Sequence, residues 1–162
     1  MAIQTGETLP AATLIAFTDK GPAEVALEDK LKGRKVVIFA VPGAFTPTCH
    51  SAHVPSFIRT MKEFTKKGVD EIICLSVNDP FVMGAWGEAT GATKAGITML
   101  ADADGSFTAE IGMDFDAPPV GLHHRSIRYA MVVEDGVVQT LQVEEKRGVC
   151  ELTGGEALLE TL

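Results

Sequence analysis

The segment Val36–Val41 constrains the fold more than any other part of the chain. Its six residues are all apolar and mostly β-branched or aromatic, without the polar alternation of a half-exposed strand. This pattern predicts a central strand that is buried on both faces. A second largely apolar run, Ile72–Val77, follows a segment in which apolar residues recur at spacings of three and four: Val54, Phe57, Ile58, Met61 and Phe64. Strand, helix and strand in this order predict a parallel βαβ unit.

The rest of the chain supplies shorter elements of both kinds. We expect a weak strand at 13–17, a helix opened by Asp79–Pro80, a strand at 97–100, a hairpin of 129–133 and 137–143, and a closing helix at 155–162. The sequence has neither repeats nor a linker, and 162 residues suit one domain spanning 1–162. We therefore predict an α/β fold with three layers, in which helices flank a central mixed sheet, as in thioredoxin-like proteins.

Composition excludes several classes of function. The formal net charge of −8 disfavours nucleic acid as a partner. No stretch approaches the roughly 20 apolar residues of a membrane helix, and the N-terminus lacks the features of a signal peptide. We expect a cytoplasmic protein, or one from an organelle interior if a transit peptide has been removed. The odd number of three widely spaced cysteines, without a Cys-x-x-Cys pair, argues against a disulfide-stapled fold.

The segment 41–50 carries the chemistry. It places Cys49 in the first turn of a helix that follows the central strand, where free N–H groups and the helix dipole favour the nucleophilic thiolate. Thr46 and Thr48 are N-cap types, and the Thr46 hydroxyl is close enough in sequence to bond the sulfur or a bound oxygen. Pro42 and Pro47 are expected to fix the loop and shield the sulfur. The alternative is that Cys49 is a small buried hydrophobic residue.

These residues resemble a known family. Pro42, Thr46 and Cys49 resemble the Pro-x-x-x-Thr-x-x-Cys motif of peroxiredoxins, and the string Val-Pro-Gly-Ala-Phe-Thr-Pro-Thr-Cys at 41–49 is typical of the type 5, or plant type II, branch. Further segments resemble that branch in the same order: Leu75–Met83 with Trp86, Leu100–Asp102 and Arg128–Val133. The resemblance extends over residues 2–162.

The resemblance implies an antioxidant enzyme with a thioredoxin-like fold, which reduces hydrogen peroxide and alkyl hydroperoxides without a metal or organic cofactor. Cys49 corresponds to the peroxidatic cysteine, which becomes a sulfenic acid. Thr46 would bond the peroxide, Pro42 would limit access, and Arg128 matches the active-site arginine, whose charge favours the thiolate and the leaving oxygen. The resemblance further implies a homodimer packed near the active-site face and recycling by glutaredoxin, thioredoxin or glutathione.

The route of recycling stays open, because some relatives resolve the sulfenic acid with a second cysteine. Cys74 lies in the middle of a predicted strand and reads first as a buried structural thiol. Cys150 lies in a predicted loop, which could move, although its position departs from the animal-type pattern. Arg125 is either a residue that braces the site or a surface residue.

Other classes of function remain as alternatives. Cys49 and His53, one helical turn apart, could bind zinc together with His50, His123 and His124, although adjacent histidines generally diverge. We expect instead that His53 packs near the site and that the other histidines lie at the surface. A Cys–His hydrolase would need an orienting group and an acyl pocket that the sequence does not identify. An interaction or chaperone-like protein would function without Cys49.

Overall fold

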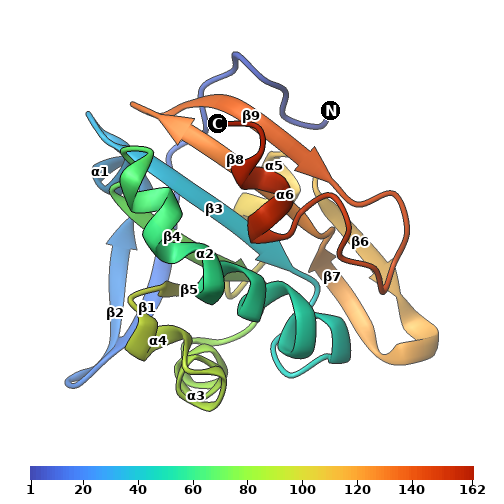
Figure 1. Ribbon diagram of the computed structural model, residues 1–162. Helices are drawn as coiled ribbons and strands as arrows, with labels where there is room; N and C mark the ends of the chain where they lie inside the picture. The colour runs from blue at the N-terminus through green and yellow to red at the C-terminus, as the bar shows by residue number, and fades with distance from the viewer.

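A seven-stranded mixed sheet forms the centre of the computed structural model, which describes residues 1–162 (Figure 1). Its strand order is β2-β1-β5-β4-β3-β8-β9. The strands are β1 (Thr13–Thr18), β2 (Gly21–Ala26), β3 (Lys35–Val41), β4 (Glu71–Ser76), β5 (Thr98–Ala101), β8 (Tyr129–Glu134) and β9 (Val137–Val143). Strands β3, β4 and β5 run parallel, whereas the remaining neighbours are antiparallel.

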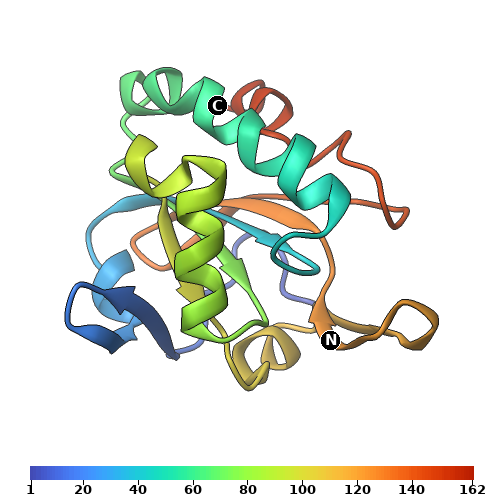
Figure 2. The same cartoon turned by 90° about the horizontal axis from the view of Figure 1, so that it is seen from below.

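Helices cover both faces of this sheet (Figure 2). One face packs against α2 (Val54–Lys66), α3 (Pro80–Thr90), α4 (Ala92–Ala95) and α6 (Gly155–Leu159). The opposite face packs against α1 (Leu27–Leu31) and α5 (Ser106–Glu110). The prediction of a three-layer α/β fold with a central mixed sheet is confirmed. None of the helices combines the length and the hydrophobicity that crossing a bilayer requires.

Strand β3 is buried on both faces, as its sequence predicts. Successive side chains of a strand point to opposite faces, so Val37, Phe39 and Val41 pack under α2 and α3. Val36, Ile38 and Ala40 enter the core on the other side. Because fully burying a valine or isoleucine contributes about 1.5–3 kcal/mol, this strand stabilises both halves of the core. Its carboxyl end leads directly into the segment that carries Cys49.

The predicted βαβ unit and hairpin are also confirmed. Strands β3 and β4 pair in parallel across the connection that contains α2. Helix α3 begins where Asp79 accepts a hydrogen bond of 2.8 Å from the N–H of Val82. The β8–β9 turn places Asp135 at φ 48° and Gly136 at φ 80°, the left-handed conformations that a type I′ turn requires.

Three strands and one irregular turn differ from the sequence-based expectations. Strand β2 pairs along one edge of the sheet, and β6 (Asp114–Ala117) and β7 (Leu122–Ser126) form a separate hairpin joined by a 3₁₀ turn at Pro118–Val120. This hairpin projects beyond the main sheet in both views (Figures 1 and 2).

The helix expected after the central strand begins at Pro47, but Cys49–His53 form a π-helical turn before α2. Neither Thr46 nor Thr48 caps its N-terminus with a side-chain hydrogen bond, because both hydroxyls bond carbonyl groups elsewhere.

Candidate active site

Cys49 lies at the carboxyl end of the central strand, at the start of the π-helical turn. Its side chain is fully buried. Strand β3 ends at Val41 because the following Pro42 has no N–H for the sheet. In the connecting loop Phe45 has φ 65°, an uncommon conformation for a residue with a side chain. Strained backbone of this kind tends to occur at functional sites.

The guanidinium of Arg128 faces this thiol. Arg128 immediately precedes β8, which runs antiparallel to β3, so it lies beside the end of β3 from which Cys49 follows. Its Nη2 donates a hydrogen bond of 3.1 Å to Cys49 Sγ. Arg128 is buried and forms no salt bridge, since all three salt bridges of the chain involve other arginines or lysines. The buried guanidinium therefore bonds the thiol and has no carboxylate within ion-pair distance.

His53 holds Arg128 from the other side. Arg128 Nη1 donates to His53 Nδ1 over 2.9 Å, and the opposite ring nitrogen, Nε2, lies 2.9 Å from the carbonyl oxygen of Thr153. Burial, followed by the charge of Arg128, lowers the pKa of His53 to about 3. The ring is therefore neutral at physiological pH, which lets Nδ1 accept from Arg128 while Nε2–H donates to Thr153. The expectation that His53 packs near the site is confirmed.

Thr46 and Pro42 line a cavity together with Arg128. The Thr46 hydroxyl donates to the carbonyl of Gly43 over 2.7 Å, so its proton is directed away from Cys49 and its lone pairs remain available. Pro42, Thr46 and Arg128 all line one cavity of about 670 Å³, which we call the active-site cavity. The structure thus brings together Pro42, Thr46, Cys49 and Arg128, although Cys49 itself lies beneath the lining.

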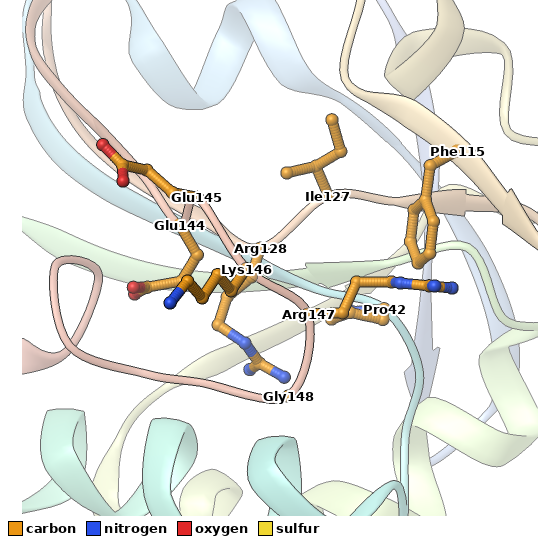
Figure 3. A pocket seen from close by; sticks show the side chains of 9 residues that line it. All are labelled: Pro42, Phe115, Ile127, Arg128, Glu144, Glu145, Lys146, Arg147 and Gly148. Carbon is orange, nitrogen blue, oxygen red and sulfur yellow. The ribbon is translucent and has the colours of Figure 1, made fainter.

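A smaller hollow of about 220 Å³ adjoins this cavity and shares Pro42, Phe115, Arg128, Arg147 and Gly148 with it. Figure 3 shows its lining side chains. In this view the guanidinium of Arg128 points toward the helical segment that carries Cys49, whereas Arg147 extends toward Phe115.

Comparison with known proteins agrees with this geometry. Residues 4–159 match the Redoxin family. The chloroplastic peroxiredoxin-2E-2 of Oryza sativa subsp. japonica is 44% identical over 164 residues, covering 99% of this chain and 72% of that protein. The chain belongs to the peroxiredoxins. It is therefore a thiol-dependent peroxidase, and the predicted resemblance to the plant type II branch is confirmed.

Solved peroxiredoxin structures share the whole fold. Reduced Prx3 from Vibrio vulnificus, in complex with hydrogen peroxide, is 46% identical, with a TM-score of 0.91 and 98% coverage of each chain. Peroxiredoxin 5 from Alvinella pompejana is 31% identical, with a TM-score of 0.85 and coverage of 98% of this chain and 97% of that one.

Arg125 braces the active-site loop of this peroxiredoxin. It is half-buried, and its Nη1 donates to the carbonyl of Pro42 over 3.4 Å. A Cβ atom at Gly43 would lie only 2.9 Å from the same nitrogen, so a side chain there would displace the Arg125 guanidinium. Of the two alternatives for Arg125, the structure favours the bracing role.

A loop at 144–154 closes the site from the C-terminal side. Its anchor is Glu144, whose carboxylate accepts hydrogen bonds from the N–H groups of Glu151, Leu152 and Thr153 and from the Thr153 hydroxyl. Burial acts to raise the pKa of Glu144, but these hydrogen bonds together lower it. The Thr48 hydroxyl ties the loop to the start of the helix through the carbonyl of Gly148, over 2.9 Å.

The two other cysteines differ in environment. All three cysteines are free thiols. Cys74 is fully buried in β4, and burial, followed by the nearness of Cys49, raises the pKa of its thiol well above the ordinary value. Cys150 is half-buried in the closing loop, with its sulfur 3.8 Å from the Thr153 hydroxyl oxygen. Burial also raises the pKa of Cys150.

The remaining histidines do not join Cys49. His123 and His124 are exposed on β7, as expected. His50 is only partly exposed, and its Nδ1 accepts a hydrogen bond of 3.0 Å from Trp86 Nε1. No group of three or more His, Cys, Asp or Glu side chains is placed to hold a metal ion. The structure therefore does not assemble the hypothetical zinc cluster.

The sequence predicted that His53 lies near the site, but it predicted neither its contact with Arg128 nor the part of Thr153. The spacing of four residues between Cys49 and His53 was the available signal. However, the hydrogen bonds of His53 reach partners 75 and 100 residues away, which local sequence does not encode.

Proposed function

We propose that Cys49 is the peroxidatic thiol and that it reduces hydrogen peroxide and alkyl hydroperoxides. The observation that carries this proposal is the buried guanidinium of Arg128, which bonds Cys49 Sγ over 3.1 Å and has no carboxylate partner. A buried charge is costly unless it is paired, and a Cys49 thiolate supplies the missing negative charge. The complex of Vibrio vulnificus Prx3 with hydrogen peroxide supports the choice of substrate.

The reaction follows from a thiolate beside a cation. The sulfur attacks the O–H oxygen of the hydroperoxide, an S–O bond forms and the O–O bond breaks. The electron pair of the broken bond stays on the other oxygen, which takes the hydroperoxide's proton and leaves as water or an alcohol. Cys49 remains as a sulfenate, oxidised by two electrons, which becomes the sulfenic acid when it takes a proton from water.

Thr46, Arg128 and Pro42 each have a proposed part in this step. The Thr46 hydroxyl donates its hydrogen bond to the carbonyl of Gly43, so its oxygen is suited to accept a hydrogen bond from the O–H of the substrate. Arg128 donates N–H groups to the negative charge that develops on the leaving oxygen. Pro42 lines the cavity beside them and restricts access to the buried sulfur.

His53 is proposed as a positioning residue that acts through Arg128. Its neutral ring accepts from one guanidinium nitrogen while the other bonds Cys49, so the arginine is fixed at two points. A charged ring at this place would repel Arg128 and would have no proton acceptor at Nδ1. The low pKa of His53, about 3, supports a ring that remains neutral across physiological pH.

The sulfenic acid must then be reduced by two thiols. We propose that one condenses with Cys49 to form a disulfide and release water, and that glutaredoxin, thioredoxin or glutathione supplies the remaining electrons. If the chain uses a thiol of its own, Cys150 in the closing loop is better suited than Cys74. Cys150 is only half-buried, whereas Cys74 is fully buried in a central strand that would have to open.

We also propose a homodimer that packs near the active-site face. Large apolar side chains are exposed on the active-site loop and on the adjoining elements: Phe45 52%, Phe81 60% and Phe17 49%. Such side chains are commonly covered by a partner. We expect the protein in the cytoplasm or, as for the chloroplastic and mitochondrial relatives, in an organelle interior.

Mass spectrometry after one equivalent of hydrogen peroxide tests the proposal. Wild-type protein and the variants Cys49→Ser, Cys74→Ser and Cys150→Ser are compared. We expect rapid oxidation at Cys49, and loss of peroxide consumption in Cys49→Ser alone. An internal disulfide would identify the resolving cysteine, whereas a persistent sulfenic acid would assign that task to an external thiol. If Cys49 remains reduced while peroxide persists, the proposal is wrong.

A further inference from the structure

The active-site cavity is much larger than hydrogen peroxide requires. Its volume of about 670 Å³ lies within the range of sites that bind molecules of drug size. One wall comes from the projecting β6–β7 hairpin and is apolar, formed by Phe115, Ala117, Pro119, Val120 and Leu122. Hydrogen peroxide makes no use of such a wall, whereas a hydrocarbon chain would bury apolar surface against it.

A second cation lines the same cavity. Arg147, in the loop that closes the site, borders both the active-site cavity and the smaller hollow beside it. It forms none of the salt bridges of the chain, all of which involve Lys30, Arg34 or Arg59. Its charge is therefore available to a ligand.

The two guanidinium groups point to different parts of the site. Arg128 points toward the helical segment of Cys49, whereas Arg147 extends past Pro42 toward Phe115 on the apolar wall (Figure 3). The carboxylates nearest in sequence do not compete for Arg147. Glu144 accepts hydrogen bonds from the backbone of its own loop, and Glu145 points to the opposite side of the hollow.

We propose that Arg147 binds the carboxylate of an acidic organic hydroperoxide, such as that of a long-chain fatty acid. This inference rests on the proposed function and names a class of substrate for the same site. The hydroperoxide group lies between Thr46 and Arg128, the hydrocarbon chain follows the β6–β7 wall, and the carboxylate meets Arg147. Since the net charge of −8 disfavours anions in general, selection of an acid requires a local cation such as this one.

The test compares an acid with its own ester. The second-order rate constants for oxidation of Cys49 are measured with a fatty-acid hydroperoxide and with its methyl ester, both at concentrations below micelle formation. The two substrates share the peroxide and the chain and differ in the carboxylate. We expect wild-type protein to prefer the acid, and Arg147→Gln to lower the acid-to-ester ratio about fivefold, as an exposed ion pair allows. Arg147→Lys should restore part of the preference.

Lys146→Gln is the matched control, because it removes the same charge from the adjacent residue, which lines the smaller hollow but not the active-site cavity. Its acid-to-ester ratio should equal that of the wild type. The inference is overturned if Arg147→Gln leaves the ratio within twofold of wild type, or if Lys146→Gln lowers it equally. Failure of the proposed function looks different: wild-type Cys49 would then react with neither hydroperoxide, nor with hydrogen peroxide.

Discussion

The two ends of the central sheet differ in whether their charged side chains have an oppositely charged partner. At the end where β4 begins, the carboxylate of Glu71 pairs with Lys30 and Arg34 over 2.9 and 2.8 Å. It also accepts a hydrogen bond from the Thr98 hydroxyl. Burial acts to raise the pKa of Glu71, but these hydrogen bonds and charges lower it. The charges at this end neutralise one another, as expected of groups that serve the fold.

At the opposite end, Arg128 is more deeply buried and has no carboxylate partner. One guanidinium nitrogen donates to the neutral ring of His53, and another donates to the sulfur of Cys49. A cation left without a structural counterion is available to a reactive anion. The reactive end of the sheet therefore differs from the other end in that its buried charge lacks an oppositely charged partner.

Removal of the unpaired cation should have the largest effect. We expect Arg128→Gln to lower the second-order rate constant for hydrogen peroxide about 10²- to 10³-fold, the range found when one donor to a developing oxyanion is lost. Stopped-flow measurement of Cys49 oxidation checks this. Arg34→Gln, which removes an arginine from the neutralised end, is the control and should leave the rate unchanged. If Arg128→Gln lowers this rate constant less than threefold, the proposed electrostatic role of the arginine is wrong.

The neutral histidine gives an intermediate effect, which appears as a pH dependence of stability. The pKa of His53 falls from 6.5 to about 3 on folding, so below about pH 6.5 the unfolded chain binds a proton that the folded chain does not. The free energy of unfolding should therefore decrease as the pH falls through this window, with a slope from this residue that rises to about 1.4 kcal/mol per pH unit near pH 5.

Urea denaturation between about pH 6.5 and about pH 5 measures this slope, and it largely avoids the titration of carboxylates, which occurs below that window. His53→Gln keeps an acceptor for Arg128 and a donor for Thr153 but cannot be protonated, so its slope should be shallower by the stated amount. Equal slopes in the two proteins would mean that His53 is not buried in its neutral form.

The paired end should show the smallest effect. The side chain of Arg34 is 35% exposed, and Lys30 still balances Glu71 when Arg34 is replaced. We expect Arg34→Gln to lower the free energy of unfolding by less than about 1 kcal/mol, and by still less at high salt. Chemical denaturation at low and high salt tests this. A loss of more than about 2 kcal/mol would show that the Glu71 end also depends on each of its charges, so that the proposed difference between the two ends is wrong.

Sequence predicted the elements whose burial is continuous. Strands β3 and β4, helix α2 and the β8–β9 hairpin have unbroken apolar runs, helical periodicity or a turn that requires left-handed residues, and all of these signals are local. Strand β2 and the β6–β7 hairpin have partly exposed strands, so their composition resembles that of loops. Their pairing becomes evident only in the folded chain.

The same distinction between local and long-range signals applies to the active site. The motif around Cys49 and the position of Arg128 could be identified from the sequence through a family resemblance, and the structure brings them to within 3.1 Å. The π-helical turn, the double contact of His53 and the anchoring of the closing loop by Glu144 depend on partners from distant segments. No local pattern specifies such contacts.

The most direct test of the unpaired cation is the ultraviolet absorbance of the Cys49 thiolate at neutral pH. The protein carries Cys74→Ser and Cys150→Ser, so that Cys49 is the remaining thiol, and it is compared with the same protein carrying Arg128→Gln. We expect the absorbance of about one thiolate per chain when Arg128 is present and its loss when Arg128 is replaced. If the protein that retains Arg128 shows no thiolate absorbance, the buried guanidinium is not balanced by Cys49, and Arg128 does not activate this thiol.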